Sequence, residues 1–215
     1  MKEKVLEIIE KEKLVAVIRG KDEEDAYLIS KKVIEGGIRI IELTFSTPFV
    51  ENTIERLSKE NISGVLIGAG TVLDDITARI AIMKGARFIV SPHLDKDISR
   101  VCNRYKVPYL PGCATITEIV KALESGVDLV KLFPGDMLGA GFIKNTKGPL
   151  PHANMMPSGG VSIENMDKWL EVGAYALGIG SALTKHIPTR GYESVKEETE
   201  KFCKKYKEVI DSLKK

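Results

Sequence analysis

Short apolar runs and amphipathic segments follow one another along this chain, and this alternation is its main structural signal. Short apolar runs bounded by glycine or proline are typical of buried strands, whereas apolar residues three or four positions apart mark one face of a helix. The runs lie at residues 14–19, 38–44, 65–67, 88–90, 108–110, 129–133, 155–157 and 176–179. Helical spacing is found at 22–34, 52–59, 76–83, a segment reaching about 105, 116–123, 140–145, 164–171 and 195–213, with a short helix over 5–9. The pattern therefore predicts eight strands, each followed by a helix, and an extra helix at the N-terminus.

Turn residues support this division of the chain. Asp22 stands where it can act as an N-cap, since its side chain can accept a hydrogen bond from the first turn of the helix. Four glycines, Gly36, Gly85, Gly126 and Gly173, each separate a helical segment from the next strand. This is the usual C′ position of a helix, where the left-handed backbone favours glycine.

Alternating strands and helices predict a parallel sheet, and eight such units close into a TIM (β/α)8 barrel. An open doubly wound sheet is the alternative. No Ser- or Pro-rich linker interrupts the pattern, so we expect one barrel domain over residues 1–215. That length is small for a barrel, and its loops must be short.

Bulk composition excludes several classes of protein. The 32 basic and 30 acidic residues nearly cancel, so neither nucleic acid nor an anionic membrane is expected as a partner. No apolar run approaches the roughly 20 residues needed to cross a bilayer. Three scattered cysteines without metal spacing fit a reducing compartment. We therefore expect a soluble cytoplasmic protein.

Lys131 is the most informative residue of the chain, because it interrupts the apolar run at 129–133. Strand alternation places Lys131 on one face together with Leu129 and Phe133, and Pro134 ends the strand. Burial of an unpaired ammonium group costs roughly several kcal/mol, so such a lysine is expected to lose its proton easily. A neutral amine in an apolar pocket is a nucleophile for carbonyl carbon, as in Schiff-base enzymes. The alternative is a structural lysine paired with a carboxylate.

In a barrel, reactive groups lie at the carboxyl ends of the strands. In this chain those ends carry Arg19, Glu42, Thr71, Pro92 and Lys131, among others. Alternation directs both Glu42 and Lys131 into the barrel, where a carboxylate beside an imine can shuttle protons. A buried Glu–Lys ion pair without catalytic function is the alternative.

Glycine-rich turns follow the last two predicted strands. They comprise Ser158, Gly159 and Gly160 after one strand, and Gly180 and Ser181 after the other. In many barrels this position binds phosphate through exposed backbone N–H groups and a hydroxyl. Turn geometry alone could explain either loop, but the two together in this position favour a phosphate site.

Two other motifs carry no ligand. Gly68-Ala69-Gly70 is half of a dinucleotide fingerprint but lacks its third glycine and the later acidic residue. His93, His152 and His186 follow different strands without the spacing of metal ligands, so no metal and no cofactor are expected.

The chain resembles the 2-keto-3-deoxy-6-phosphogluconate (KDPG) / 4-hydroxy-2-oxoglutarate (KHG) aldolase family over residues 14 to about 183. The matching runs are 36–37 with 41–44, 68–72, 91–92, 111–112, 131–134 and 157–161. The resemblance implies a TIM barrel, usually trimeric, and metal-free class I aldol chemistry on a keto acid and a phosphorylated aldehyde. It further implies that Lys131 forms the imine and Glu42 is the general acid/base. Thr71, Pro92 and Phe133 would shape the pyruvate pocket, while Gly159, Gly160 and Ser181 would hold the phosphate.

One position departs from the family pattern. Many members carry an arginine four residues after the glutamate, where this chain has Ser46. Arg19 can supply the missing charge and bind the substrate carboxylate, or it can instead pair with Glu42 and tune it.

The reaction that this resemblance implies is cleavage of KDPG to pyruvate and glyceraldehyde 3-phosphate, and also of 4-hydroxy-2-oxoglutarate to pyruvate and glyoxylate. The alternatives are the phosphogalactonate epimer as substrate, a non-catalytic barrel that binds sugar phosphates, and a sugar-phosphate epimerase or isomerase on the same fold.

Overall fold

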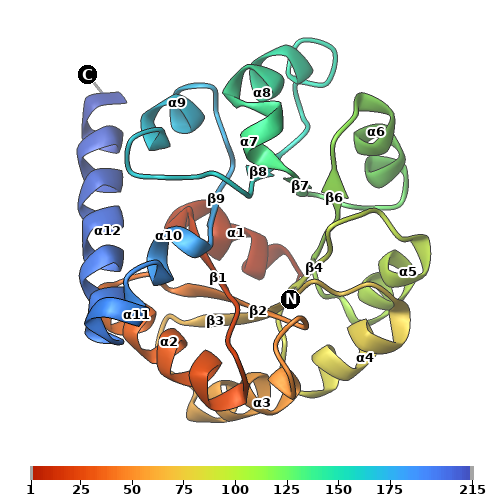
Figure 1. The fold of residues 1–215 in the computed structure, drawn as a ribbon. Helices are drawn as coiled ribbons and strands as arrows, with labels where there is room; N and C mark the ends of the chain where they lie inside the picture. The colour runs from red at the N-terminus through yellow and green to blue at the C-terminus, as the bar shows by residue number, and fades with distance from the viewer. Residues whose placement is uncertain (1, 214–215) are drawn as a thin grey trace.

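A computed structural model describes residues 2–213 as two curved sheets of parallel strands that lie around a common centre, with the helices outside them (Figure 1). This arrangement of strands is called the ring below. The strands are β1 Leu14–Ile18, β2 Ile40–Thr44, β3 Leu66–Gly70, β4 Ile89–Val90, β5 Tyr109–Leu110, β6 Gly112–Cys113, β7 Val130–Leu132, β8 Met155–Pro157 and β9 Leu177–Ile179. The helices are α1 Lys2–Glu12, α2 Glu23–Gly36, α3 Val50–Glu60, α4 Asp75–Met83, α5 Lys96–Tyr105, α6 Ile116–Glu124, α7 Gly135–Leu138, α8 Ala140–Thr146, α9 Met166–Glu171, α10 Ser181–Thr184, α11 Ile187–Arg190 and α12 Glu193–Leu213. The predicted α/β class with a parallel sheet and an extra N-terminal helix is confirmed.

The strands form two sheets, and each pairing within them is parallel. One sheet has the order β5-β4-β3-β2-β1-β9 and the other the order β6-β7-β8. Only Pro111 separates β5 from β6, and an isolated parallel bridge joins Ser158, after β8, to Gly178 in β9. Gly112, directly after Pro111, starts a short strand beside Lys131.

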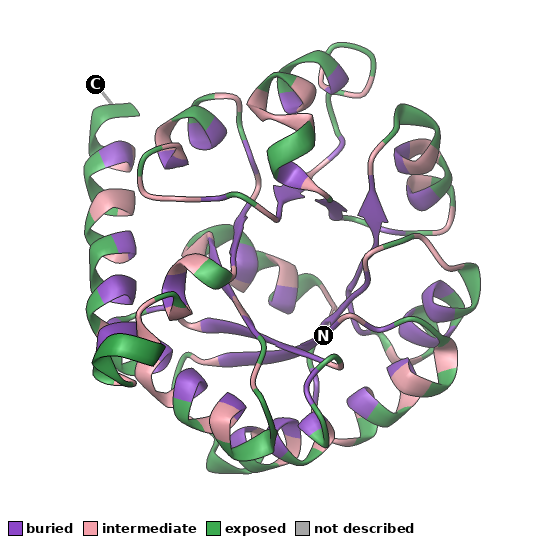
Figure 2. Cartoon of the chain, in the orientation of Figure 1, coloured by how far each residue is buried: buried purple, intermediate pink, exposed green. Residues whose placement is uncertain are grey.

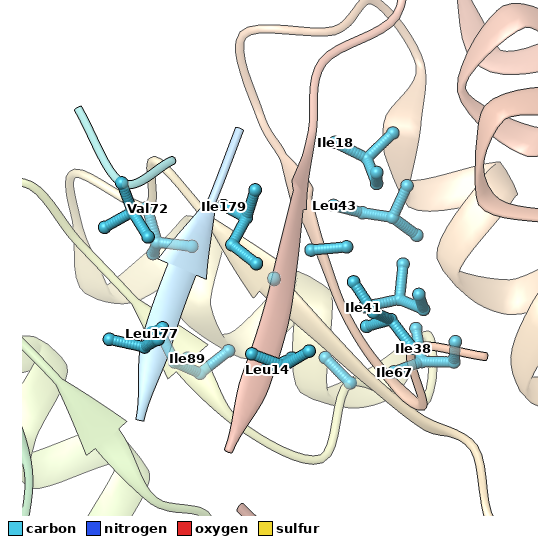
Figure 3. Close-up of a cluster of buried hydrophobic side chains, with 14 of the residues drawn as sticks. Leu14, Ile18, Ile38, Ile41, Leu43, Ile67, Val72, Ile89, Leu177 and Ile179 are labelled. Carbon is cyan, nitrogen blue, oxygen red and sulfur yellow. The ribbon is translucent and has the colours of Figure 1, made fainter. Parts of the chain in front are cut away.

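The period-two pattern of the strands produces two buried clusters. The inner cluster lies inside the ring and contains Val15, Ile40, Leu66, Phe88, Val90, Leu110, Leu129, Met156 and Ala176, together with Val5 and Ile9 of α1. Figure 1 accordingly shows α1 crossing behind the centre of the ring. The larger cluster lies between strands and outer helices, and Figure 3 shows its members from β1, β2, β3, β4 and β9. In Figure 2 the strands are buried while the helices expose one face.

The helix caps that the sequence predicted are found in the structure with one exception. Asp22 accepts a hydrogen bond from the backbone N–H of Asp25 at 2.8 Å, as predicted. Three of the four predicted C′ glycines have a left-handed backbone, with φ of 101° at Gly85, 82° at Gly126 and 79° at Gly173.

Gly36 is the exception, and its predicted position was wrong. It is the last residue of α2, and Gly37, with φ of 110°, is the C-cap. Gly36 instead permits close packing of α2 on α12, because a Cβ atom at Gly36 would lie 2.6 Å from Thr199 Cβ.

Several loops that follow strands contain short helices. The loop after β7 contains α7 and α8, and Ser181 begins α10 instead of lying in a turn. The helix predicted from residue 164 begins at Met166. Within residues 2–213, no helix combines the length and the apolar character needed to cross a membrane.

The contact between α2 and α12 leads to a stability prediction. Gly36→Ala is expected to lower the free energy of unfolding by about 1–3 kcal/mol, because the added methyl group overpacks a rigid helix contact. Gly141→Ala is the matched control: Gly141 is helical and has open space at its Cβ position, so this variant should be neutral or slightly stabilising. Urea unfolding measures both, and equal stability of the two variants would contradict the packing role of Gly36.

Candidate active site

Lys131 lies in the middle of β7, inside the ring of strands. It pairs with Gly112 on β6 and with Met156 on β8, and its backbone N–H donates to the carbonyl of Pro111 at 2.8 Å. Only 6% of the residue is exposed. Its neighbours Val130 and Leu132 point the other way, into the outer cluster. The alternation that the sequence suggested thus places the amine in the interior.

Glu42 lies on β2 and is completely buried, with 0% exposure. Lys131 Nζ lies 3.6 Å from Glu42 Oε1, so the two groups form a buried ion pair. Neither carboxylate oxygen has a hydrogen-bond partner among residues 2–213. The structure therefore brings Glu42 and Lys131 together from two distant strands, as expected. Both oxygens of the Glu42 carboxylate can still accept hydrogen bonds.

Gly70 makes room for this carboxylate. A Cβ atom at Gly70 would lie 2.1 Å from Glu42 Oε1, so every larger residue would displace the side chain. The dinucleotide fingerprint that Gly68-Ala69-Gly70 partly matches carries no function here, and these three residues form the end of β3. The signal that could have identified them is their spacing, because glycines two apart in a strand empty one face.

The three predicted pocket residues lie just after β7, β3 and β4, and Phe133 contacts the amine. The ring of Phe133 has its centroid 5.2 Å from Lys131 Nζ, within the range of a cation–π contact. Thr71 directly follows β3 with a left-handed backbone, φ 54°. The Pro92 carbonyl oxygen approaches Gly112 so closely that a Cβ atom there would lie 2.1 Å away. Since Gly112 pairs with Lys131, the loop after β4 lies beside the lysine strand.

The loop that contains Pro92 is fixed by a buried phenol. Tyr109 OH shares a hydrogen bond of 2.6 Å with Ser91 Oγ and donates to the His93 carbonyl at 3.0 Å. Burial raises the pKa of Tyr109, so the phenol keeps its proton. Sequence reasoning missed this network, because its members lie 16 to 18 residues apart.

The predicted phosphate residues lie together at the ends of β8 and β9. Ser158 is buried and bridges to Gly178, and Gly159 and Gly160 have φ of 94° and 73°. Gly180 precedes Ser181, the exposed first residue of α10. The carbonyl of Ser158 accepts a hydrogen bond of 2.8 Å from Gly135 N–H, which adds the loop after β7 to this cluster.

Asp136 is a residue near this loop that the sequence analysis did not consider. A Cβ atom at Gly160 would lie 2.6 Å from Asp136 Cβ. The glycine is therefore required where α7 approaches the loop after β8.

Arg19 is exposed and lies beside Ser46, not beside Glu42. Its Nε donates a hydrogen bond of 2.8 Å to Ser46 Oγ, and no ion pair of the described chain includes Arg19. The alternative in which Arg19 pairs directly with Glu42 is not the arrangement found here.

The buried cysteine thiols and possible metal-ligand clusters are the other candidate reactive groups, beside the Lys131–Glu42 pair. Burial raises the pKa of the Cys102 and Cys113 thiols to about 12, so both are protonated at neutral pH. From residue 2 to residue 213, no three or more His, Cys, Asp or Glu side chains gather as a metal site would require. Lys131 and Glu42 are therefore the pair with the geometry for covalent and acid–base chemistry.

Known proteins resemble this chain in sequence and in fold. The family described as KDPG and KHG aldolase matches residues 5–196. The 2-dehydro-3-deoxy-6-phosphogalactonate aldolase of Escherichia coli is 31% identical over 92% of this chain and 96% of its own length. The 2-dehydro-3-deoxy-phosphogluconate aldolase of Treponema pallidum is 34% identical over 77% of this chain and 79% of its own.

Solved structures of this kind of aldolase are also similar to this chain. A structure described as native KDPGal has a TM-score of 0.85, 31% identity, and coverage of 92% of this chain and 96% of that one. KDPG aldolase from Legionella pneumophila, with pyruvate captured as a covalent carbinolamine intermediate, has a TM-score of 0.83 and 26% identity over 91% of this chain and 96% of that one. The chain belongs to the KDPG and KHG aldolase family. It is thus an enzyme of the carbon–carbon lyase class.

The buried ion pair leads to a second stability prediction. Lys131→Ala leaves the Glu42 carboxylate buried without a partner and should lower the free energy of unfolding by about 3–5 kcal/mol. The double variant Lys131→Met/Glu42→Gln removes both charges and should recover most of that loss. Lys32→Ala, which breaks partly exposed ion pairs to Glu35 and Glu193, is the control and should cost less than about 1 kcal/mol. Urea unfolding at neutral pH decides, and a Lys131→Ala variant as stable as the control would contradict the pairing.

Proposed function

We propose that the chain is a class I aldolase that cleaves KDPG to pyruvate and glyceraldehyde 3-phosphate, with Lys131 as imine-forming residue and Glu42 as general acid/base. The observation that carries this proposal is a buried amine 3.6 Å from a carboxylate that has no other partner in the described chain. The covalent pyruvate carbinolamine of the Legionella relative supports the same chemistry.

In this mechanism Lys131 first passes its ammonium proton to Glu42, and the neutral amine adds to the C2 ketone. Glu42 then returns this proton to the departing hydroxyl group, so loss of water gives a protonated imine and leaves Glu42 as a carboxylate. The imine accepts the electron pair of the C3–C4 bond as that bond breaks. Glu42, acting through a water molecule, takes the proton of the C4 hydroxyl, and glyceraldehyde 3-phosphate leaves. The same group returns a proton to C3 of the enamine, and hydrolysis releases pyruvate and regenerates the amine.

The remaining residues are proposed to bind the two ends of the substrate. Thr71, Pro92 and Phe133 surround the pyruvyl part, and the Arg19 guanidinium holds its carboxylate. The phosphate binds to the adjoining loops after β8 and β9. Its proposed ligands are Ser158, Gly159, Gly160, Gly180 and Ser181. The left-handed φ of Gly159 and Gly160 and the bridge between Ser158 and Gly178 support this assignment.

The galactonate epimer is a second candidate substrate. The E. coli phosphogalactonate aldolase aligns over a larger share of this chain than the T. pallidum phosphogluconate aldolase, 92% against 77%. The two sugar acids differ at one stereocentre. A third candidate substrate is 4-hydroxy-2-oxoglutarate, which lacks the phosphate.

The proposal includes a closed (β/α)8 barrel formed by a single domain over residues 1–215. Two observations support closure of the ring: Pro111 alone separates β5 from β6, and the Ser158–Gly178 bridge connects β8 to β9. Three free cysteines, Cys102, Cys113 and Cys203, support a cytoplasmic location.

A homotrimer is the proposed assembly. Its support on the surface is the outer side of α4 with the residues just before it, where Leu73, Ile76, Ile80 and Met83 are between 41% and 69% exposed. A helix that is apolar on both sides is normally covered. Sedimentation should give three times the 23.7 kDa chain mass, and a monomer would refute the assembly.

The substrate assignment is tested with the purified protein and each of the three keto acids. Pyruvate release, coupled to its reduction by lactate dehydrogenase, should give the highest kcat/KM for KDPG, and activity should survive EDTA. A higher kcat/KM for the galactonate epimer would transfer the assignment to it. Absence of pyruvate release from all three would refute the proposed function.

Glu42→Gln tests the acid/base role separately from imine formation. The variant keeps the shape of the side chain but cannot accept a proton, so cleavage and exchange of the pyruvate methyl protons should slow by about 10²–10⁴-fold. Imine formation should remain measurable. Proton exchange at nearly the wild-type rate would assign Glu42 to a structural ion pair instead.

Ser181→Ala tests the phosphate site. In the condensation direction, KM should rise clearly for glyceraldehyde 3-phosphate and little for unphosphorylated glyceraldehyde, because only the former has a phosphate for the hydroxyl to bind. If both aldehydes lose the same factor, Ser181 supports the fold and does not bind phosphate.

A further inference from the structure

A chain of hydrogen-bonded side chains connects Arg19 to the strand core. Arg19 Nε donates to Ser46 Oγ at 2.8 Å, Ser46 Oγ lies 3.0 Å from Thr44 Oγ1, and Thr44 Oγ1 donates to the Ile18 carbonyl at 2.9 Å. Thr44 is 1% exposed, whereas Arg19 and Ser46 lie at the surface. The series therefore runs from a buried backbone group of β1 out to an exposed guanidinium.

The direction of each hydrogen bond in this series is determined. The Ile18 carbonyl can only accept, so the single proton of the Thr44 hydroxyl is used there. Ser46 must then donate to Thr44 Oγ1, and its oxygen is left to accept from Arg19 Nε. Each hydroxyl donates once and accepts once, an arrangement in which neighbouring hydrogen bonds strengthen one another.

A second contact fixes the same two loops. Gly20 N–H donates to Thr47 Oγ1 at 2.9 Å, and Thr47 is 2% exposed. The turn after β1 is thus attached at two points to the turn after β2. Because Thr44 follows Glu42 by two residues on the same face of β2, these contacts hold Arg19 on the carboxyl-end side of the Lys131–Glu42 pair.

The contact with Ser46 occupies Nε and leaves the two terminal nitrogens of the guanidinium. Within residues 2–213, neither of them takes part in a hydrogen bond or ion pair. Two parallel N–H groups of this kind match a carboxylate. An unconstrained arginine loses much rotamer freedom when it binds, and a side chain already held through Nε loses less.

We infer that Ser46 is a positioning residue for the keto-acid carboxylate: it holds the Arg19 guanidinium in place through a hydrogen-bond series anchored on Thr44 and Ile18. This inference rests on the proposed function, in which Arg19 binds that carboxylate. In this proposal the function of Ser46 is to set the position of the positive charge of Arg19.

The test is a double-mutant cycle of Ser46→Ala and Arg19→Ala, with pyruvate titrated by isothermal calorimetry and kcat and KM measured for KDPG. Ser46→Ala should weaken pyruvate binding and raise KM by about three- to tenfold with little change in kcat, because one hydrogen bond that orders Arg19 is lost. Arg19→Ala should cost more, about tenfold or above. Adding Ser46→Ala to Arg19→Ala should have no further effect. Ser46→Thr, which keeps the hydroxyl, should restore most of the affinity.

Ser63→Ala is the control for removal of an exposed hydroxyl, and thermal melting checks each variant for folding. An equal loss from Ser46→Ala with and without Arg19 would overturn the inference, since Ser46 would then act independently of the guanidinium. Unchanged pyruvate affinity in Ser46→Ala would overturn it as well. Failure of the wild-type protein to bind pyruvate would instead refute the proposed function, so the two failures are distinguishable.

Discussion

A lysine amine inside a ring of apolar strands is the constraint on which the rest of this structure depends. An isolated charge there would be costly, and Glu42, 3.6 Å away, is the group that compensates it. The two residues come from β7 and β2, which belong to different sheets, so only the curved arrangement of both sheets brings them together. The apolar layer below them, closed by Val5 and Ile9 of α1, keeps water from the lower side. The same burial that makes the pair expensive is what makes its amine and carboxylate useful for imine chemistry.

Inward-facing glycines allow polar groups to approach one another closely around this pair. Gly70 leaves the volume that the Glu42 carboxylate occupies, Gly112 admits the Pro92 carbonyl, and Gly178 admits the Ser158 side chain. Lower in the ring the corresponding inward positions are filled by Leu66, Leu110 and Ala176. The inward-facing positions thus change from bulky apolar side chains to glycines toward the carboxyl ends of the strands. This change leaves room for polar groups at the same ends where the functional residues gather.

The sequence predicted the elements and the central pair because both depend on local periodicity. Alternation alone gives the inward direction of Lys131 and Glu42, and the spacing of helical residues gives the parallel α/β order. Gly36 could not be distinguished from Gly37 as a helix cap, since that depends on contact with Thr199, far along the chain. The Arg19–Ser46 hydrogen bond spans 27 residues and has no sequence signature. Nor does sequence reveal the short helices α7, α10 and α11, which tertiary packing stabilises more than intrinsic propensity does.

The central claim is that Lys131 forms the covalent bond to the keto acid, and borohydride reduction in the presence of pyruvate tests it most directly. Peptide mapping by mass spectrometry should find one reduced pyruvyl group per chain, located on Lys131, and Lys131→Ala should lose the label. Full labelling of Lys131→Ala, or a reduced adduct on another lysine of the wild-type protein, would contradict the account.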